Sequence, residues 1–374
     1  MELEFSADQD ELRDSIRAVL ARECPVTLAR KVVETREPPT ELWNTMCTLG
    51  WPALTVPEED GGIGLGMIEA GILAEELGRV IAPGPLLPTV TQFVPAVRAL
   101  AAPEQRTRWL GAVAGGEVSG SLAIAEAGGS YDPARVQATV DADGNDVVLR
   151  GEKRFVVEGD AVDELFVVAR TPGSRGDEGV CAVVVPFSSV RTTPVHALDG
   201  SRRLAHVDLD GVRVAADRVL EAPDAALRLR AAIEEATVAV ALEMVGTAQS
   251  MFDVTLDYAR QREQFGVPIG SFQAIKHKFA DMMIALERAR ATGYYAALTI
   301  AEDDPRRSSA TSVAKAAAGD CQRLLVKEGI QIHGGIGYTW EHDMQLYAKR
   351  IKSGEALFGT TSAHRARIAG LLGV

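Results

Sequence analysis

The sequence has 374 residues, 47% of them hydrophobic and 24% charged, which are ordinary values for a globular protein with a sizeable core. Its formal net charge of −13 argues against nucleic acid as a partner, although local Arg and Lys side chains can still bind a small anionic ligand. No apolar run reaches the length of about 18 residues that a membrane span needs, and the acidic N-terminus lacks the apolar segment of a secretory signal. We therefore predict a cytoplasmic protein of roughly two or three domains that does not cross a membrane.

The cysteines and histidines give no sign of a metal site. Cys24, Cys47, Cys181 and Cys321 are scattered along the chain without CxxC spacing, which is typical of reduced, structural thiols. The six histidines form no ligand pattern with cysteines or carboxylates. We predict no metal site.

The first part of the chain, residues 1–118, has the apolar spacing of helices. Asp8–Glu23 places Leu12, Ile16 and Leu20 on one face. Further helices are predicted from Thr40 to Leu49, from Met67 to Val80 and from Thr91 onward. This part is therefore predicted to be a helical domain.

A glycine-rich stretch, Gly61–Gly66, interrupts these helices with the sequence GGIGLG. Such a run can bind a dinucleotide, but that interpretation requires a preceding strand and a βαβ unit. Neither is visible here. A tight loop that leads into a helix is the favoured interpretation.

Residues 119–222 change to a period of two, which is typical of strands. Val136, Ala138 and Val140 alternate with other residues, and the sequence DADGN then predicts a hairpin turn before the apolar residues 147–149. Further strands are predicted at 165–169, 180–185 and 206–214. The middle of the chain is therefore predicted to be a small antiparallel β domain.

Residues 223–374 return to helical spacing and are predicted to form a four-helix bundle, which makes the fold class α+β. The third helix is expected to begin at Ser308 or Ser309 and to break within Gln331–Gly337, and a fourth begins near Glu341. Apolar seam positions recur at alternating spacings of four and three. They are Ile233, Thr237, Val240, Met244, Thr247, Met251, Val254 and Tyr258, followed by Ile275, Phe279, Met282, Leu286, Ala289, Gly293, Ala296 and Ile300.

The connection between the first two helices of this bundle, Tyr258–Lys278, carries residues that a turn does not need. Phe265 and Gly266 break the first helix, and Ser271 is placed to cap the second. An Arg side chain can bind a pyrophosphate with two hydrogen bonds, so Arg262 beside an aromatic ring and an amide suits a planar, anionic cofactor. The alternative is an ordinary surface turn with a solvated Arg.

Four motifs in this order resemble the acyl-CoA dehydrogenase family. The first is Arg262-x-x-Phe265-Gly266 followed by Pro268-Ile269 and Phe272-Gln273, and the others are residues 56–66, residues 331–338 and Gly359-Thr360. The resemblance covers nearly the whole chain. It implies an α domain, a β domain and a four-helix bundle in this order, with the bundles packing into a dimer of dimers.

The resemblance also implies FAD bound at a subunit interface. In the family, the β domain of one chain holds the flavin, and the bundle of a neighbouring chain contributes residues to the pyrophosphate and adenosine. By motif, the residues that this chain would contribute are all intact. They are Arg262, Phe265, Gln273, Gln331, Gly334 and Gly335, hereafter the six contributed residues. The two glycines would let backbone N–H groups approach a phosphate, and they can equally end a helix.

The part of the chain that would hold its own flavin departs from the family pattern. The family sequence Thr-Glu-Pro-Gly-Ala-Gly-Ser-Asp becomes AEAGGSYD at residues 125–132, with Tyr131 near the place of a small hydroxyl residue. The family sequence Trp-Ile-Thr becomes Phe155-Val156-Val157. Val157 cannot donate a hydrogen bond to the flavin ring.

The catalytic base that the family uses is missing. In the family reaction, α,β-desaturation of an acyl-CoA thioester, a carboxylate removes the α-proton while the β-hydrogen leaves as hydride to the flavin. Phe358 occupies one family position of that Glu, and Ala236 occupies the other. Glu355, Glu235 and Glu243 are the nearest substitutes, and each has a structural or solvated interpretation. No catalytic residue is assigned.

Together these features favour a flavoprotein-family subunit without its own base. It resembles the base-lacking subunits of the actinobacterial α2β2 acyl-CoA dehydrogenases that act on steroid side-chain CoA thioesters. A partner subunit would then supply the base and bind FAD and the acyl-CoA substrate. The alternatives are a self-sufficient homotetrameric dehydrogenase with a relocated base, a scaffold protein without a redox role, and a flavin monooxygenase on the same fold.

Overall fold

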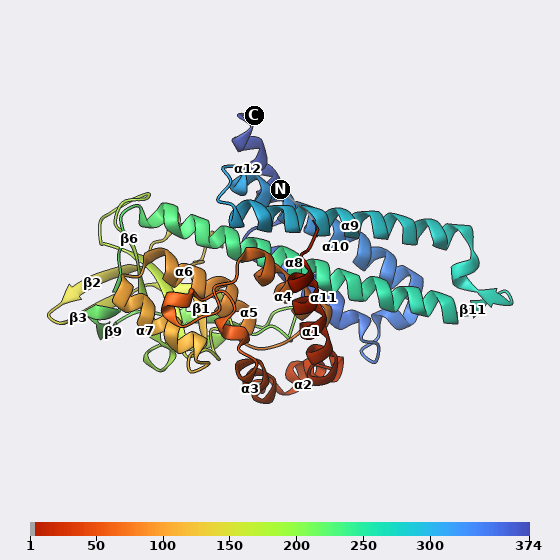
Figure 1. Ribbon diagram of the computed structural model, residues 1–374, viewed down its shortest axis with the longest axis horizontal. Helices are drawn as coiled ribbons and strands as arrows, with labels where there is room; N and C mark the ends of the chain where they lie inside the picture. Colours follow the sequence, from red (N-terminus) through yellow and green to blue (C-terminus); the bar gives the residue numbers. More distant parts are fainter. Residues whose placement is uncertain (1–3) are drawn as a thin grey trace. The chain divides into compact units, whose positions relative to one another are not determined.

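The computed structural model describes residues 4–374, and its order of helices and strands confirms the predicted α+β fold (Figure 1). Helices come first, strands occupy the middle, and long helices follow. The first helices are α1 (Ala7–Glu23), α2 (Val26–Thr35), α3 (Thr40–Thr48), α4 (Met67–Arg79), α5 (Leu86–Pro88), α6 (Val94–Leu100) and α7 (Pro103–Ala114). The last are α8 (Ala225–Gln261), α9 (Gln273–Ala301), α10 (Arg307–His333), α11 (Met344–Ala356) and α12 (Thr361–Leu371).

The chain forms two compact units. One contains the described residues up to Thr35, Met67–Ala82 and Thr237–Val374, and the other contains Arg36–Gly66 and Pro83–Ala236. Helix α8 begins in the second unit and continues into the first. The Gly61–Gly66 stretch is a loop that follows a short 3-10 turn and leads into α4, as the favoured interpretation predicted. None of the helices in residues 4–374 has both the length and the apolarity needed to cross a membrane.

The strands of the middle segment form two sheets. A seven-stranded sheet has the order β10-β6-β5-β2-β3-β9, with β1 beside β5, and a three-stranded sheet has the order β4-β8-β7. Pairing is mostly antiparallel, but β1 and β5 run parallel. The strands are β1 (Gly120–Ala123), β2 (Thr139–Asp143), β3 (Asp146–Arg150), β4 (Glu152–Val157), β5 (Glu164–Arg170), β6 (Val180–Pro186), β7 (Arg191–Pro194), β8 (Leu204–Asp208), β9 (Val212–Ala215) and β10 (Val219–Leu220).

Two local predictions were wrong. The segment 206–214 is not one strand, because Gly211, with φ 78°, turns the chain between β8 and β9, which belong to different sheets. Ser271 does not cap α9, since its hydroxyl donates a hydrogen bond to the carbonyl of Pro268 and Phe272 precedes the helix.

The predicted seam of α8 and α9 is buried over most of its length. Near the connection between the two helices, however, Val254, Tyr258, Ile275 and Phe279 are only half-buried. All four cysteines are free thiols, and burial raises the pKa of Cys24, Cys181 and Cys321 to about 12. These thiols therefore have the low reactivity of structural cysteines.

Helices α4 and α8 pack with almost no space between their backbones. A Cβ atom added to Gly246 would lie 1.8 Å from the carbonyl oxygen of Glu75, and one added to Gly78 would lie 2.1 Å from that of Glu243. The hydroxyl of Thr247 donates a hydrogen bond to the carbonyl of Gly78 at 3.0 Å. Only glycine allows this approach, because any side chain would overlap the backbone of the facing helix.

A buried ion pair joins α8 to α11 in the same unit. The Glu243 carboxylate accepts a hydrogen bond from the Arg350 guanidinium at 3.0 Å. Arg350 also donates to the carbonyls of Ile81 and Ala82, directly beyond α4. The two charged side chains are almost fully buried, so removing either would leave an uncompensated charge in the interior.

The turn between α11 and α12 is held from two sides. Buried Lys315 donates hydrogen bonds to the carbonyls of Glu355 and Gly359 at 3.0 and 2.9 Å. The Nε2 atom of His364 lies 3.0 Å from the carbonyl of Phe358. Burial, with a smaller effect of the Lys315 charge, lowers the pKa of His364 to about 4. Neutral His364 is therefore part of the folded structure.

Replacing Gly246 with Ala is expected to destabilise the protein by about 1–3 kcal/mol despite the better helix propensity of Ala, because the methyl group would overlap the Glu75 carbonyl. Chemical denaturation measures the change. Gly370→Ala is the matched control, since Gly370 lies in α12 with open space around it, and that variant should be as stable as the parent or slightly more so. Equal effects of the two substitutions would contradict the close packing.

Because of His364, the free energy of unfolding should decrease as the pH falls below neutral. As pH falls below about 6.5, the unfolded chain binds a proton that the folded chain takes up only near pH 4, so stability is lost across that window, by up to about 3 kcal/mol. We expect His364→Gln to lose less stability than the parent between pH 7 and pH 4.5 in denaturant titrations. Parallel curves for the two proteins would show that His364 is not held neutral.

Candidate functional site

A short hairpin joins α8 to α9 and carries the first contributed residues. Strand β11 (Glu263–Gln264) pairs with β12 (Val267–Pro268), and the backbone N–H of Ile269 donates to the carbonyl of Arg262 at 2.8 Å. Both turn residues have positive φ, 56° at Phe265 and 79° at Gly266. A bulky residue rarely adopts this conformation, so its presence at Phe265 is typical of a functional position.

The side chains of this hairpin face solvent. The exposed guanidinium of Arg262 has no hydrogen bond or ion pair with any residue in the range 4–374, whereas Arg260, two positions earlier, lies 3.6 Å from Asp257. The Phe265 side chain is 94% exposed and meets Phe272 edge-on, with ring centroids 6.1 Å apart. Gln273 is exposed, and its amide nitrogen lies 3.1 Å from His277.

The other contributed residues lie at the C-terminal end of α10. The helix ends at Gly334, with φ 65° and ψ −142°, and a 3-10 turn follows over Gly334–Tyr338. A Cβ atom added to Gly334 or Gly335 would meet no atom within 4 Å, and Gln331 is exposed. The Gly334 N–H bonds to the carbonyls of Gln331 and Ile330, so this glycine ends the helix while the surface above both glycines stays open to a ligand.

The structure brings these two loops to the same end of one unit. Tyr258, in the last turns of α8, stacks on His333, the last residue of α10, with ring centroids 4.5 Å apart. The Tyr258 hydroxyl also donates to the His333 carbonyl at 3.4 Å. Arg262 is one helical turn beyond Tyr258, and Gly334 directly follows His333. The six contributed residues therefore share one end of the helices.

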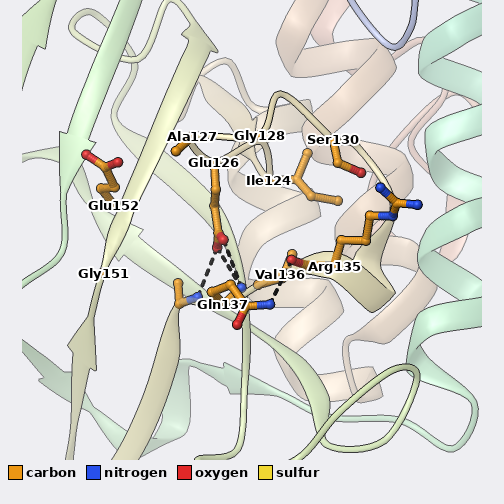
Figure 2. Close-up of a pocket in the computed structure, with 11 residues that line it drawn as sticks. Ile124, Glu126, Ala127, Gly128, Ser130, Arg135, Val136, Gln137, Gly151 and Glu152 are labelled. Carbon is orange, nitrogen blue, oxygen red and sulfur yellow. Dashed lines mark hydrogen bonds between the residues drawn. The ribbon is translucent and has the colours of Figure 1, made fainter. Parts of the chain in front are cut away.

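A pocket of about 490 Å³ lies in the β region of the other unit (Figure 2). Its wall includes Glu126, Gly128 and Ser130, which belong to the altered run 125–132, and also Arg135 and Gln137. Glu152 and Arg135 lie on opposite sides of the pocket (Figure 2). Arg135 and Gln137 could not be recognised from the sequence, because an exposed polar residue before a strand carries no distinguishing pattern.

The carboxylate of Glu126 holds the loop beside this pocket. It accepts hydrogen bonds from the backbone N–H groups of Gln137 and Ala138 at 2.8 and 2.9 Å (Figure 2). It also forms an ion pair with Lys153, whose side chain is 0% exposed, at 2.7 Å. Burial lowers the pKa of Lys153 to about 8, although the Glu126 charge opposes this effect. Through these contacts, Glu126 and Lys153 hold the loop in place.

The segment Phe155-Val156-Val157, which the resemblance would place beside the flavin, offers no side-chain hydrogen-bond donor. Val157 is buried where β4 pairs with β8, opposite Leu204, and it does not line the pocket. The β4–β8 register shifts between Lys153 and Val156, and Phe155 has φ 58°. Its ring meets His206 instead. This chain thus lacks the hydroxyl that the family places against the flavin.

The two positions at which the resemblance leads us to expect the base, 358 and 236, carry apolar side chains. Phe358 is buried in the turn between α11 and α12, with φ 55°, and Ala236 is fully buried in α8. Neither side chain can accept a proton.

The substitute carboxylates are held by structural partners. Glu243 pairs with Arg350, and Glu235 accepts hydrogen bonds from Arg98 at 2.6 and 2.7 Å. Glu355 accepts bonds from the Thr361 N–H and hydroxyl and pairs with Lys352. Burial raises the pKa of Glu355, but these donors outweigh it and leave the pKa below its usual value. A carboxylate with a lowered pKa is a weak base.

The residues of this chain fit FAD unequally. The pyrophosphate end of a dinucleotide is suited by the unpaired guanidinium of Arg262, by the exposed side-chain amides and by the accessible backbone of the glycines. The buried Val157 does not suit the flavin ring. Within residues 4–374, no group of three or more His, Cys, Asp or Glu side chains could hold a metal ion.

Comparison with known proteins identifies the family. Residues 6–117 and 207–372 match the descriptions "acyl-CoA dehydrogenase, N-terminal domain" and "acyl-CoA dehydrogenase, C-terminal domain". Acyl-CoA dehydrogenase IpdE2 of Mycobacterium tuberculosis is 32% identical over 341 residues, which span 91% of this chain and 89% of that protein.

Solved structures of heteromeric complexes are also similar. A chain of the ChsE4-ChsE5 complex from Mycobacterium tuberculosis matches with a TM-score of 0.89 and 25% identity, over 100% of this chain and 99% of that one. A chain of a Tcur3481-Tcur3483 steroid ACAD variant matches with a TM-score of 0.86 and 28% identity, over 98% of both chains. With these motifs, this fold and these relatives, the chain belongs to the acyl-CoA dehydrogenase family.

Proposed function

We propose that this chain is the base-lacking subunit of a heteromeric acyl-CoA dehydrogenase that desaturates an acyl-CoA thioester. A partner subunit supplies the catalytic carboxylate and holds the flavin ring and the substrate. This chain contributes Arg262, Gln273, Gln331 and their neighbours to the pyrophosphate and adenosine of the FAD. When bound, FAD supplies the hydride acceptor.

The proposal rests on a contrast between the residues that a chain gives to its neighbour and the residues that it needs for its own reaction. The residues that a chain would give to its neighbour are intact and exposed, and the guanidinium of Arg262 has no partner among residues 4–374. The residues that a chain needs for its own reaction are replaced by Phe358, Ala236 and Val157. General decay would alter both sets alike, whereas selection for a contributing subunit preserves only the first.

The relatives support the assembly and the class of substrate. The ChsE4-ChsE5 complex and the Tcur3481-Tcur3483 steroid ACAD each pair two different chains. We therefore infer an α2β2 assembly with a second acyl-CoA dehydrogenase subunit and a bulky, steroid-derived acyl group on CoA. A self-sufficient homotetramer would need a relocated base, and Glu235, Glu243 and Glu355 each have a structural partner instead.

Arg262→Ala should weaken FAD retention by the complex, because a charge-assisted, two-pronged contact to pyrophosphate is lost. A loss of about 10- to 150-fold in affinity is expected, which corresponds to about 1.5–3 kcal/mol for hydrogen bonds to charged groups. Flavin content per complex and fluorescence titration of the flavin-free complex with FAD measure it.

Arg260→Ala is the matched control for this substitution. Arg260 is exposed at the end of the same helix and faces Asp257, so its removal changes the net charge equally but should leave FAD retention intact. Equal FAD affinity in the parent and in Arg262→Ala would mean that Arg262 is only a surface charge.

Expressed alone, the chain is expected to show no acyl-CoA dehydrogenase activity. Loss of a general base typically lowers the rate by about 10²–10⁴-fold, and the flavin environment of this chain is also incomplete. Co-expression with a homologous subunit that carries the Glu should restore turnover. Assembly mass, flavin content and reduction of an electron acceptor with several acyl-CoAs are measured for both preparations.

The same experiment separates the alternatives. Robust turnover by the chain alone that is abolished by Glu355→Gln or Glu243→Gln would establish a relocated base. A yellow, FAD-loaded chain that oxygenates a substrate without desaturating acyl-CoA would indicate a monooxygenase. A colourless chain that gains neither flavin nor activity with any Glu-bearing partner would favour a scaffold.

A further inference from the structure

The contact between Tyr258 and His333 is more specific than packing at a bundle end requires. The rings are stacked, with centroids 4.5 Å apart and planes inclined by 25°. The hydroxyl of Tyr258 reaches the His333 carbonyl. This pair connects the helix that precedes the Arg262 hairpin to the residue that precedes Gly334 and Gly335.

His333 itself is held in one orientation. Its Nδ1 atom lies 2.8 Å from the carbonyl of Gly329, and because a carbonyl only accepts, Nδ1 carries the hydrogen. The ring of His342 meets His333 edge-on at 4.7 Å. A Cβ atom on Gly337 would lie 2.9 Å from the His333 Cβ, so the 3-10 turn folds directly against this residue.

A main-chain hydrogen bond extends from Tyr258 to the Arg262 loop, and Gly334 directly follows His333 in the chain. The Arg262 N–H donates to the Tyr258 carbonyl at 2.8 Å, and the Ile269 N–H donates to the Arg262 carbonyl at 2.8 Å. On the other side, the Gly334 N–H bonds to the carbonyls of Ile330 and Gln331. The backbone positions of Arg262 and Gly334 are therefore both set relative to the Tyr258–His333 pair.

We propose that Tyr258 and His333 are positioning residues that fix the separation between Arg262 and the open backbone of Gly334 and Gly335. This inference rests on the proposed function, in which both loops contact the dinucleotide of a partner subunit at once. A pyrophosphate group is short, so two loops bind it together without a reordering cost only when their spacing is already correct. Neither ring touches the cofactor in this arrangement.

The test uses the full complex of this chain with its Glu-bearing partner. Tyr258→Leu removes the stacked ring, and Tyr258→Met fills similar space without a flat ring in case the first variant assembles poorly. Tyr258→Phe keeps the ring and removes only the hydroxyl. Phe252→Leu is the control, because Phe252 makes a different aromatic contact between α8 and α9, with Phe279 at 5.6 Å.

Tyr258→Leu and Tyr258→Met should weaken FAD binding to the complex by about tenfold. Both substitutions remove the stacked ring, and the two loops then lose their fixed spacing. Excess FAD should restore turnover, which separates affinity from the chemical step. Tyr258→Phe should recover most of the affinity, since the hydroxyl contact is long. Phe252→Leu should lower the thermal midpoint yet leave FAD affinity unchanged. Fluorescence titration, assembly mass and thermal unfolding are the measurements.

Two results would overturn the inference. The first is unchanged FAD affinity in both Tyr258→Leu and Tyr258→Met while Arg262→Ala binds FAD weakly. The second is an equal loss of FAD affinity in Phe252→Leu, because bundle stability alone would then account for the effect. If Arg262→Ala also binds FAD normally, the proposed function fails as well, so the two failures are distinguishable.

Discussion

The buried ion pair of Glu243 and Arg350 ties together the parts of the unit that holds the long helices. Arg350 in α11 binds Glu243 in α8 and the carbonyls that follow α4. The glycine contacts between α4 and α8 keep these backbones close enough for the pair to form. A charge buried this deeply must stay paired, since removing one partner of such a pair typically costs about 3–5 kcal/mol. Glu243 is therefore a structural residue.

The turn at Phe358 is held by a separate set of contacts. Lys315 and His364 hold the turn at Phe358 by bonds to main-chain carbonyls, which do not depend on the side chain at position 358. Glu355 is bound to the start of α12. The side chain at position 358 can therefore vary without breaking these contacts.

The end of the helices near Arg262 has the opposite character. Seam residues there are half-buried, the hairpin has a strained Phe265, and Arg262 is unpaired among the described residues. A surface with exposed aromatic rings, an unpaired cation and open glycine backbone is suited to a ligand or partner more than to the stability of the isolated chain. The stacked pair of Tyr258 in α8 and His333 in α10 lies at this same end.

The sequence alone determined the class of the fold, because the apolar period of helices and strands reflects the geometry of each element. It also indicated the family, because the family motifs depend on residue identity at fixed positions, and it led us to expect the six contributed residues and the absence of the base. It could not predict that Ser271 does not cap α9 or that residues 206–214 form two strands, because cap and turn geometry depend on a few dihedral angles. Only the tertiary structure decided that Glu235 and Glu243 have partners distant in the sequence, and that Tyr258 meets His333. Those contacts join residues far apart in the chain, and no local pattern records which of them will meet.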